Sequence, residues 1–448
     1  MNKKPCFTIP FVCFLAMLTI IMIQGITNVV KMRPLDGFTQ GVRKEKLSLK
    51  TYLDGTYQAY LTRMAKQHTG FREFFIRSYN QMAYSCFDKI TNNNIVKGYN
   101  DELYMTMYLN DITGKKLIEI YGSVDNAKVE AEKNVEATLT LIDTLRQHGT
   151  EFIFVFCPSK TGVYPEFMPK EYQEQIADFQ LVEYYIELFK EKGIPHIDFY
   201  HYFQQIKDEF PYPLYTKTGT HWAESTLPFV CDSIFRKIEE VTGYQMPSIE
   251  IQGLNITNEY SIQDGELEGM LNLLFPLRKP AVPKPVFALK DTVGKDRPNL
   301  LVVDDSYYVQ MRRNCFSKAF NNWDHWAYNK DLYSSRPYYN GKHMNQIFDA
   351  NEVIEDADIV IAMFTTAYLT RSYMCGFIPF ALQQLQNGGN NDEEAIALII
   401  QDIKNTPEWY QSVAKQAEQH GITIEESLRN NAEYLLQARK QAKQEMSN

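Results

Sequence analysis

The chain has 448 residues, and a typical domain has about 100–200, so the length predicts two or three structural units. Hydrophobic residues make up 44% and charged residues 23%, a globular composition that excludes wholesale disorder. With 46 basic and 55 acidic residues the net charge is −9, which argues against nucleic acid as a partner. Seven cysteines without a CxxC pair support neither structural zinc, nor a thioredoxin-type motif, nor a disulfide scaffold.

The first segment with a clear pattern is apolar. No residue between 5 and 30 is charged, and about 20 apolar residues are enough to cross a bilayer. Two lysines precede this run, which favours a cytoplasmic N-terminus. We therefore expect a cytoplasmic tail at 1–4 and a transmembrane signal anchor at 5–30. A cleaved signal peptide is the alternative, although no small-x-small cleavage site follows the apolar run. With either, the chain after about residue 31 is exported.

Three stretches follow the apolar run. Residues 31–92 have the pattern of a helical connecting region. Between 93 and 390, short apolar runs alternate with amphipathic segments, which is typical of an α/β sheet. Within it, 245–298 interrupts the alternation with several prolines, and we interpret this segment as an insertion or lid. Residues 391–448 are rich in Gln, Glu, Lys and Ala and predict a helical C-terminal extension.

The α/β region contains recognisable strands and helices. Four buried strands are predicted, at Glu151–Cys157, Ile194–Phe199, Asn299–Val303 and Asp358–Phe364. Apolar residues at helical spacing predict helices at Asp125–His148 and Trp222–Val241. The C-terminal extension predicts two helices, 393–420 and 424–446, with a break at Gly421.

Side chains with catalytic chemistry follow the strands. In open α/β sheets, functional groups gather beyond the carboxyl ends of strands. Ser306 follows the third strand, and at a helix N-terminus the backbone amides and the dipole could stabilise an oxyanion. A plain helix cap is the alternative. His221 could act as general base for a serine, because the unperturbed pKa of histidine is about 6.5. A histidine that caps the helix or bonds within its loop is the alternative.

A separate pair of adjacent residues, Asp324 and His325, has the composition of a catalytic Asp/His pair and stands in an aromatic setting. Adjacent side chains usually diverge, so we favour a structural role for this pair. The sequence has no cluster with metal-ligand spacing and no phosphate-cradling glycine loop, and it therefore predicts no metal site.

Several short segments together resemble one family. In chain order they are Gly70–Arg72 with Ser78–Asn80, Lys97–Gly98 with Leu103–Tyr104, Pro158–Lys160 with Tyr164–Pro165, Tyr215–Trp222, Gly265–Leu267 with Met270–Leu271, and Asp305–Tyr307. Their order and spacing over roughly 70–380 resemble the AlgJ/AlgX-type SGNH hydrolase-like domain of polysaccharide O-acetylation proteins, which is related to the DHHW family.

The resemblance implies a fold and a reaction. The fold would be a flavodoxin-like three-layer α/β sandwich with a mostly parallel sheet. Ser306 would be the nucleophile of an acyl transfer, with its backbone amide in the oxyanion hole, and His221 its base. Members of the family act on polysaccharides in the periplasm or at the cell surface, and they usually work with a membrane-bound O-acyltransferase. No cofactor is implied beyond an acetyl donor.

One departure from the family pattern concerns the catalytic triad. The triad aspartate of the family lies two residues before the histidine, and Gly219 occupies that position here. Glycine cannot orient an imidazole, so another carboxylate would be needed. The candidates nearest in sequence to Ser306 or His221 are Asp305, Asp304 and Glu224.

Three further residues are candidates for substrate binding. Lys160 could bind an anionic sugar or hold the active-site loop, with a solvated loop lysine as the alternative. Tyr164 is a similar case. Trp222 could form a platform for a sugar ring, although a tryptophan is more often a core residue.

Three hypotheses follow. The first is an O-acetyltransferase or acetylesterase with a degenerate triad, acting on an exported or cell-surface polysaccharide. The second is a catalytically inactive scaffold or glycan-binding component of an acetylation or export complex. The third is an unrelated membrane-anchored α/β protein. For the first two we expect a single-pass protein of the inner (cytoplasmic) membrane whose main domain is periplasmic or otherwise extracytoplasmic.

Overall fold

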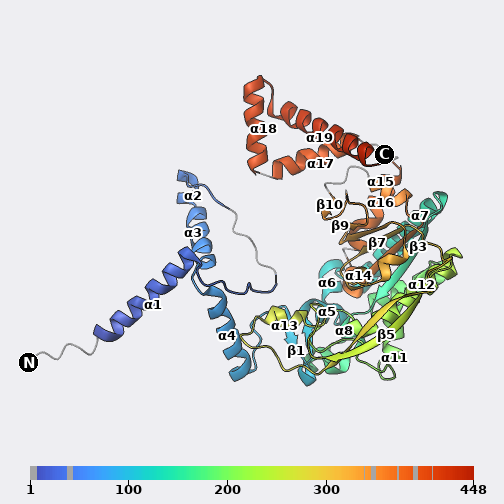
Figure 1. The fold of residues 1–448 in the computed structure, drawn as a ribbon, viewed down its shortest axis with the longest axis horizontal. Helices are drawn as coiled ribbons and strands as arrows, with labels where there is room; N and C mark the ends of the chain where they lie inside the picture. Colours follow the sequence, from blue (N-terminus) through green and yellow to red (C-terminus); the bar gives the residue numbers. More distant parts are fainter. Residues whose placement is uncertain are drawn as a thin grey trace, which may run out of the picture. The chain divides into compact units, whose positions relative to one another are not determined.

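The computed structural model describes residues 8–37, 44–337, 339–344, 350–370, 373–386, 392–405 and 407–447 (Figure 1). The chain divides into two compact units. The first unit holds Met1–Thr106, Lys217–Thr220 and Gly265–Pro280, and the second holds Met107–Thr216, His221–Asp264 and Ala281–Asn448.

A seven-stranded sheet forms the centre of the second unit. Its strand order is β10-β9-β8-β7-β11-β3-β4. The four pairs from β8 to β4 are parallel, whereas β9 pairs antiparallel with both β8 and β10. The strands are β3 (Glu151–Cys157), β4 (His196–Asp198), β7 (Leu300–Asp304), β8 (Trp323–Ala327), β9 (Asp331–Ser334), β10 (Lys342–His343) and β11 (Ile359–Thr365). The sheet is mostly parallel, as predicted.

Helices cover both faces of this sheet. The inner strands are apolar throughout because alternate residues pack into two separate cores. One core contains residues of α6 (Lys115–Tyr121), α7 (Val124–Gln147), α10 (Leu181–Lys192), α15 (Ala350–Glu355) and α16 (Phe377–Gln386). The other contains residues of α8 (Lys160–Val163), α11 (Phe199–Ile206), α12 (Leu227–Thr242) and α14 (Tyr308–Arg313). The result is the predicted three-layer α/β sandwich.

Short helical elements complete the loops around the two cores. They are α5 (Thr106–Ile112) and α9 (Lys170–Gln173), together with 3₁₀ turns at Pro165–Phe167, Glu224–Thr226, Phe316–Ala319, Thr366–Tyr368 and Tyr373–Gly376.

Two of the predicted elements differ from the structure in the second unit. The helix expected from Trp222 begins only at Leu227, because the backbone of Trp222 pairs with Tyr215 in an isolated β-bridge. The segment expected as an insertion or lid contributes a long hairpin of β5 (Ser248–Thr257) and β6 (Val282–Lys290). Prolines are tolerated in β6 because each strand of a two-stranded ribbon has an unpaired edge.

The first unit is built mainly from helices. These are α1 (Thr8–Thr27), α2 (Leu49–Leu53), α3 (Thr56–Gln67), α4 (Arg72–Phe87) and α13 (Glu266–Leu271), with a 3₁₀ turn at Tyr99–Asp101. A small hairpin of β1 (Ile95–Lys97) and β2 (Leu103–Met105) packs on α13 through four buried side chains, Ile95, Leu103, Leu267 and Leu271. Among the described residues, α1 is the one helix long and apolar enough to cross a membrane.

The described part of the C-terminal extension contains three helices where two were predicted. They are α17 (Asp392–Asn405), α18 (Pro407–His420) and α19 (Ile424–Ser447). In place of the expected helix 393–420, α17 ends at Asn405 and α18 begins at Pro407, and proline is favoured at the first position of a helix. The three helices share a core of Ile396, Ile399, Ile403, Val413, Leu428, Ala432 and Leu436.

Candidate functional site

The central strand β7 presents Ser306. Its two neighbours, β8 and β11, are parallel to it, so the carboxyl ends of three strands meet at one edge of the sheet. Ser306 follows this strand end in a tight turn, and the six-residue helix α14 begins two residues later. This is the position at which open α/β sheets place functional groups.

The structure brings Ser306 and His221 together. The distance between His221 Nε2 and Ser306 Oγ is 2.7 Å. With a neutral imidazole, the hydroxyl donates to Nε2, which is the arrangement of a serine nucleophile and its general base. The two residues are 85 positions apart in the chain, so the fold of the second unit creates this contact.

The loop that carries His221 is held by buried groups. The backbone amide of Ala223 donates to the Leu214 carbonyl at 2.8 Å, which closes the loop next to the Tyr215–Trp222 bridge. The ring of Trp222 is fully buried and meets the ring of Tyr307 edge-on at a centroid distance of 4.7 Å. Tyr307 directly follows Ser306, so the two loops pack on each other beside the reacting groups.

The three predicted substrate-binding residues contact the protein itself. Lys160 is buried, and its Nζ donates to the Thr216 carbonyl at 2.8 Å. The Tyr164 hydroxyl accepts from the Leu214 amide at 3.1 Å. Together with the buried Trp222, these contacts give all three residues a part in positioning the histidine loop.

The two aspartates before Ser306 have structural partners. Asp304 Oδ1 lies 2.5 Å from His325 Nε2, and Asp304 Oδ2 accepts from the Tyr308 amide at 2.7 Å. Asp305 Oδ2 accepts from the amide and the hydroxyl of Thr365 at 2.9 and 2.7 Å. Both carboxylates therefore tie the Ser306 turn to neighbouring elements.

The third candidate carboxylate, Glu224, lies three residues after His221. Its side chain forms an ion pair with Lys284 at 3.4 Å, and its amide donates to Asp264 Oδ1 at 3.3 Å. Burial raises the pKa of Asp264 to about 6, and the nearby charge of Glu224 adds to that shift.

The backbone amide of Ser306 is already engaged. It donates to Asp305 Oδ1 at 2.6 Å. An oxyanion hole at this amide would have to share the donor with a carboxylate. Burial, and then the charge of Asp304, raises the pKa of Asp305 to about 6.

A cluster of tyrosines beside Ser306 did not appear in the sequence analysis. Burial raises the pKa of Tyr328, whereas a hydrogen bond with the Ser306 side chain lowers it. The rings of Tyr328 and Tyr368 are 5.7 Å apart, and their hydroxyls interact. Tyr108 is fully buried near the same groups and bonds to Thr365, and burial raises its pKa strongly.

Tyr328 stands in a strained backbone conformation. Its φ is +55°, in the left-handed region that non-glycine residues rarely adopt, and its amide donates to the Asp304 carbonyl at 2.6 Å. Tyr328 directly follows β8, which the sequence analysis did not recognise as a strand. Recognition of β8 as the neighbour of β7 would have placed Tyr328 at the same sheet edge as Ser306.

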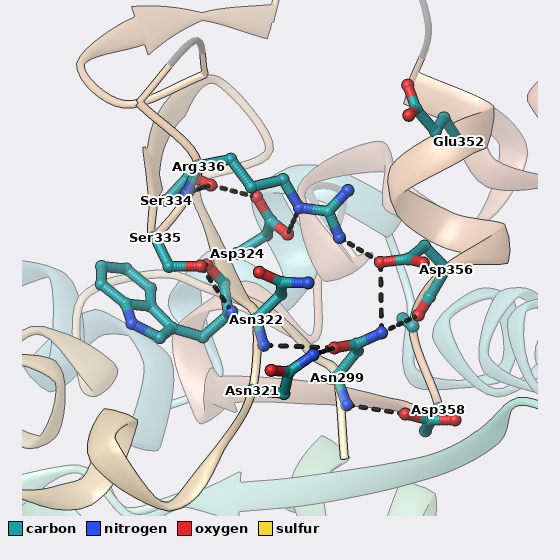
Figure 2. A network of polar contacts seen from close by, with 12 residues as sticks. Asn299, Asn321, Asn322, Asp324, Ser334, Ser335, Arg336, Glu352, Asp356 and Asp358 are labelled. Carbon is teal, nitrogen blue, oxygen red and sulfur yellow. Dashed lines mark hydrogen bonds and ion pairs between the residues drawn. The ribbon is translucent and has the colours of Figure 1, made fainter. Parts of the chain in front are cut away.

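The adjacent pair Asp324 and His325 diverges, as expected of neighbours in a strand. His325 contacts Asp304, whereas Asp324 accepts from Ser334 Oγ at 2.6 Å and pairs with Arg336 at 3.3 Å. Figure 2 shows that Asp324 belongs to a polar network around Arg336, Asn299 and Asp356. Asn299 lies at the opposite end of β7 from Ser306.

No metal cluster is present among the residues that the structure describes: no group of three or more His, Cys, Asp or Glu side chains could hold an ion.

Comparison with known families finds a match for one segment of the chain. Residues 120–293 match the model of the SGNH hydrolase-like domain of acetyltransferase AlgX. The resemblance to the AlgX-type family is confirmed. The AlgX-type segment includes His221 and ends before Ser306. No protein with a curated description matches the chain.

Solved structures resemble this chain at low sequence identity. The O-acetyltransferase domain of Pseudomonas putida AlgJ is 15% identical, with a TM-score of 0.41, over 66% of this chain and 99% of that chain. Pseudomonas aeruginosa AlgX is 17% identical, with a TM-score of 0.42, over 66% of this chain and 68% of that chain. A DHHW family protein from Eubacterium siraeum is 11% identical, with a TM-score of 0.35, over 54% of this chain and 88% of that chain.

Proposed function

We propose that the chain is an extracytoplasmic O-acetyltransferase or acetylesterase that acts on an exported or cell-surface polysaccharide through Ser306 and His221. The observation that carries the proposal is the 2.7 Å contact between His221 Nε2 and Ser306 Oγ at the carboxyl edge of the sheet. The AlgX-type match over 120–293 supports acetyl as the group that is transferred.

The first half-reaction would load acetyl onto the serine. Ser306 Oγ attacks the carbonyl carbon of an acetyl donor while His221 Nε2 takes the hydroxyl proton. The tetrahedral intermediate then collapses, and the imidazolium returns the proton to the leaving oxygen or sulfur. The product is acetyl-Ser306 and the free donor alcohol or thiol.

The second half-reaction would unload the acetyl group. His221 removes a proton from a sugar hydroxyl, whose oxygen attacks the acetyl carbon of acetyl-Ser306. The bond between Ser306 Oγ and the acetyl carbon breaks, and His221 returns the proton to the serine. The acetylated sugar leaves. Water in place of the sugar would make the protein an esterase.

A second candidate is a catalytically inactive scaffold or glycan-binding protein of an acetylation or export complex. Two observations favour it: Gly219 stands where the family has its triad aspartate, and the Ser306 amide donates to Asp305 instead of an open oxyanion site. The two candidates differ in whether Ser306 accepts an acyl group.

The proposed cellular location of the protein depends on α1. We propose that α1 spans the inner membrane once and keeps the second unit on the extracytoplasmic side. A membrane-bound O-acyltransferase that delivers acetyl across the bilayer would be the natural partner, because acetyl donors are made in the cytoplasm.

The deciding experiment compares the full chain with Ser306→Ala in hydrolysis of a chromogenic acetyl ester. In subtilisin, loss of the serine costs about 2 × 10⁶ in rate and loss of the carboxylate alone about 3 × 10⁴, so a Ser–His dyad should retain roughly 70-fold over the serine variant. We expect a 10- to 100-fold decrease, on the order of that ratio. Ser85→Ala, at an exposed site on α4, should leave the rate unchanged.

Equal rates for the wild type and Ser306→Ala would favour the inactive scaffold. A covalent probe gives an independent readout. A sulfonyl fluoride should add its sulfonyl group to Ser306 Oγ with loss of fluoride, and intact-mass measurement should find the adduct on the wild type but not on Ser306→Ala.

A further inference from the structure

The helix α4 has an unusual charge distribution. From Phe74 to Phe87 the one charged residue is Arg77. Its guanidinium is buried and donates to the carbonyls of Arg33 and Pro34 at 2.9 and 2.8 Å. The exposed surface of α4 between Phe74 and Phe87 therefore carries no charged side chain.

One face of α4 is held by the first unit. Arg77 Nη2 also contacts Asn272 Oδ1 at 3.4 Å, and Asn80 Nδ2 donates to the Leu271 carbonyl at 2.9 Å. Ala83 is buried on the same side. These contacts fix the rotation of the helix about its axis.

Most of the remaining face is apolar and exposed. Its large side chains are 45–57% exposed, and they are Phe74, Phe75, Tyr79 and Met82. Phenylalanine, tyrosine and methionine at such exposure are costly in water over a contiguous surface. A bare apolar face without charge is typical of a surface that meets another apolar phase.

This face continues onto α1. α1 packs closely on the turn that leads into α4, since a Cβ on Gly70 would lie 2.1 Å from the Ile21 carbonyl oxygen and one on Gly25 would lie 2.3 Å from the His68 carbonyl oxygen. Figure 1 shows α4 starting where α1 ends. An apolar groove of about 450 Å³ lies between them, lined by Cys13, Ala16, Met17, Ile20, Ile21, Phe71, Phe74 and Phe75.

We propose that α4 is a membrane-surface helix whose bare face lies in the lipid at the headgroup–acyl boundary, on the same side of the bilayer as the C-terminal half of α1. The inference rests on the proposed membrane anchoring by α1. The occupant of the groove between α1 and α4 is phospholipid acyl chain, because lipid-facing residues of α1 form one wall and the aromatic side chains of α4 form the other.

Charges near the helix junction agree with this placement. Lys31 follows α1 and Lys66 lies in the last turn of α3, and both are exposed. Arg72, at the first position of α4, pairs with Glu73 at 3.8 Å. Basic side chains at this level can reach lipid phosphates, while aromatic residues below them favour the interfacial zone.

Tryptophan quenching by lipids brominated on their acyl chains tests the proposal, using the full chain in phosphatidylethanolamine–phosphatidylglycerol vesicles. The four native tryptophans, Trp222, Trp323, Trp326 and Trp409, lie outside α1–α4, so their emission in the wild type can be subtracted. The variants Phe75→Trp and Met82→Trp report on α4, Met17→Trp reports on α1, and Tyr99→Trp is the control at an exposed aromatic site of the first unit.

We expect the added emission of both α4 variants to fall about two-fold or more, with little change for Tyr99→Trp. Quenching of Met17→Trp without quenching at positions 75 and 82 would overturn the proposal while leaving the anchor intact. An unquenched Met17→Trp would show that the anchoring itself fails, and the proposal with it.

Discussion

The hydroxyl and the amide of Ser306 have partners of opposite kinds. The hydroxyl meets a base, His221 Nε2, whereas the amide meets an acid, Asp305 Oδ1. A developing oxyanion would compete with that carboxylate for the amide. Another donor close to Ser306 Oγ would relieve the competition, and the Tyr328 hydroxyl is in contact with the Ser306 side chain.

We therefore predict that Tyr328→Phe lowers kcat for acetyl-ester hydrolysis about 10- to 100-fold, which is at or below the smallest usual effect of losing an oxyanion donor, about 100-fold. KM should change little, because the hydroxyl would act mainly in the transition state. Tyr202→Phe is the matched control, since both tyrosines are 40% exposed and Tyr202 lies on α11. An unchanged kcat in Tyr328→Phe would exclude the donor role.

Asp264 permits a prediction about pH. Burial raises the pKa of this carboxyl from 3.8 to about 6, so the folded state holds the proton more tightly than the unfolded state. The stabilisation is complete below the unfolded pKa of about 4 and is lost as the pH rises through about 6.

Asp264→Asn removes this titration. The stability of the variant relative to the wild type should therefore increase between pH 4 and pH 7, by up to about 3 kcal/mol for a shift of two pKa units. Urea unfolding of both proteins at several pH values measures the difference. A difference that stays constant across this range would contradict the prediction.

At the scale of elements, the end of the sheet opposite Ser306 is fastened by side chains. The amide of Asn299, just before β7, donates to Asp358 Oδ2 at 2.7 Å just before β11, and Asn299 Nδ2 donates to the Asp356 carbonyl at 3.0 Å. Arg336, just after β9, bridges Asp324 of β8 and Asp356 (Figure 2). The network joins the antiparallel β8–β9 hairpin to the parallel centre of the sheet.

Loss of Arg336 should weaken this connection. Arg336→Gln would leave the buried Asp324 carboxylate with the Ser334 hydroxyl but without its cation. We predict a loss of about 1–3 kcal/mol in the free energy of unfolding, the usual cost of an incompletely satisfied buried group. Arg313→Gln, at an exposed site on α14, should cost less than about 0.5 kcal/mol in the same denaturant titration. Equal effects of the two substitutions would contradict the bridging role.

The sequence predicted the apolar strands of the sheet better than it predicted β8. β3, β7 and β11 are buried almost throughout, so their apolar runs are visible in the sequence. β8 reads Trp-Asp-His-Trp-Ala, and its polar residues are stabilised by partners from distant segments. A pattern of hydrophobicity cannot anticipate such partners.

The sequence likewise predicted only those parts of the candidate site that lie in local motifs. Ser306 and His221 belong to local motifs, and the structure places them in contact. The surroundings depend on long-range packing: Tyr328 and Tyr368 approach Ser306 only because β8 and β11 flank β7. The buried positions of Lys160 and Trp222 likewise follow from how the two loops pack.

For the whole molecule, the C-terminal helices form a core of their own. The described buried side chains of α17–α19 pack on one another, whereas Phe377, Ile378 and Ala381 of α16 belong to the main core. We predict that a chain ending at Gln386 unfolds cooperatively, with a midpoint within about 3 °C of the full chain, a shift that corresponds to less than about 1 kcal/mol.

Thermal unfolding followed by tryptophan emission measures this midpoint. A chain ending at Gly376 is the control, because it also loses the α16 side chains of the main core and should be strongly destabilised. A large drop in the midpoint on removal of 387–448 alone would show that the C-terminal helices support the sheet.

The glycine contact between α1 and the turn before α4 limits how the protein can be re-engineered. Because neither Gly25 nor Gly70 has room for a methyl group, α1 is fitted to the rest of the first unit by shape as well as by hydrophobicity. An unrelated hydrophobic helix spliced in its place would anchor the chain but would hold α4 away from it. Fusion designs that exchange the N-terminal segment therefore need to retain a glycine in register with position 25.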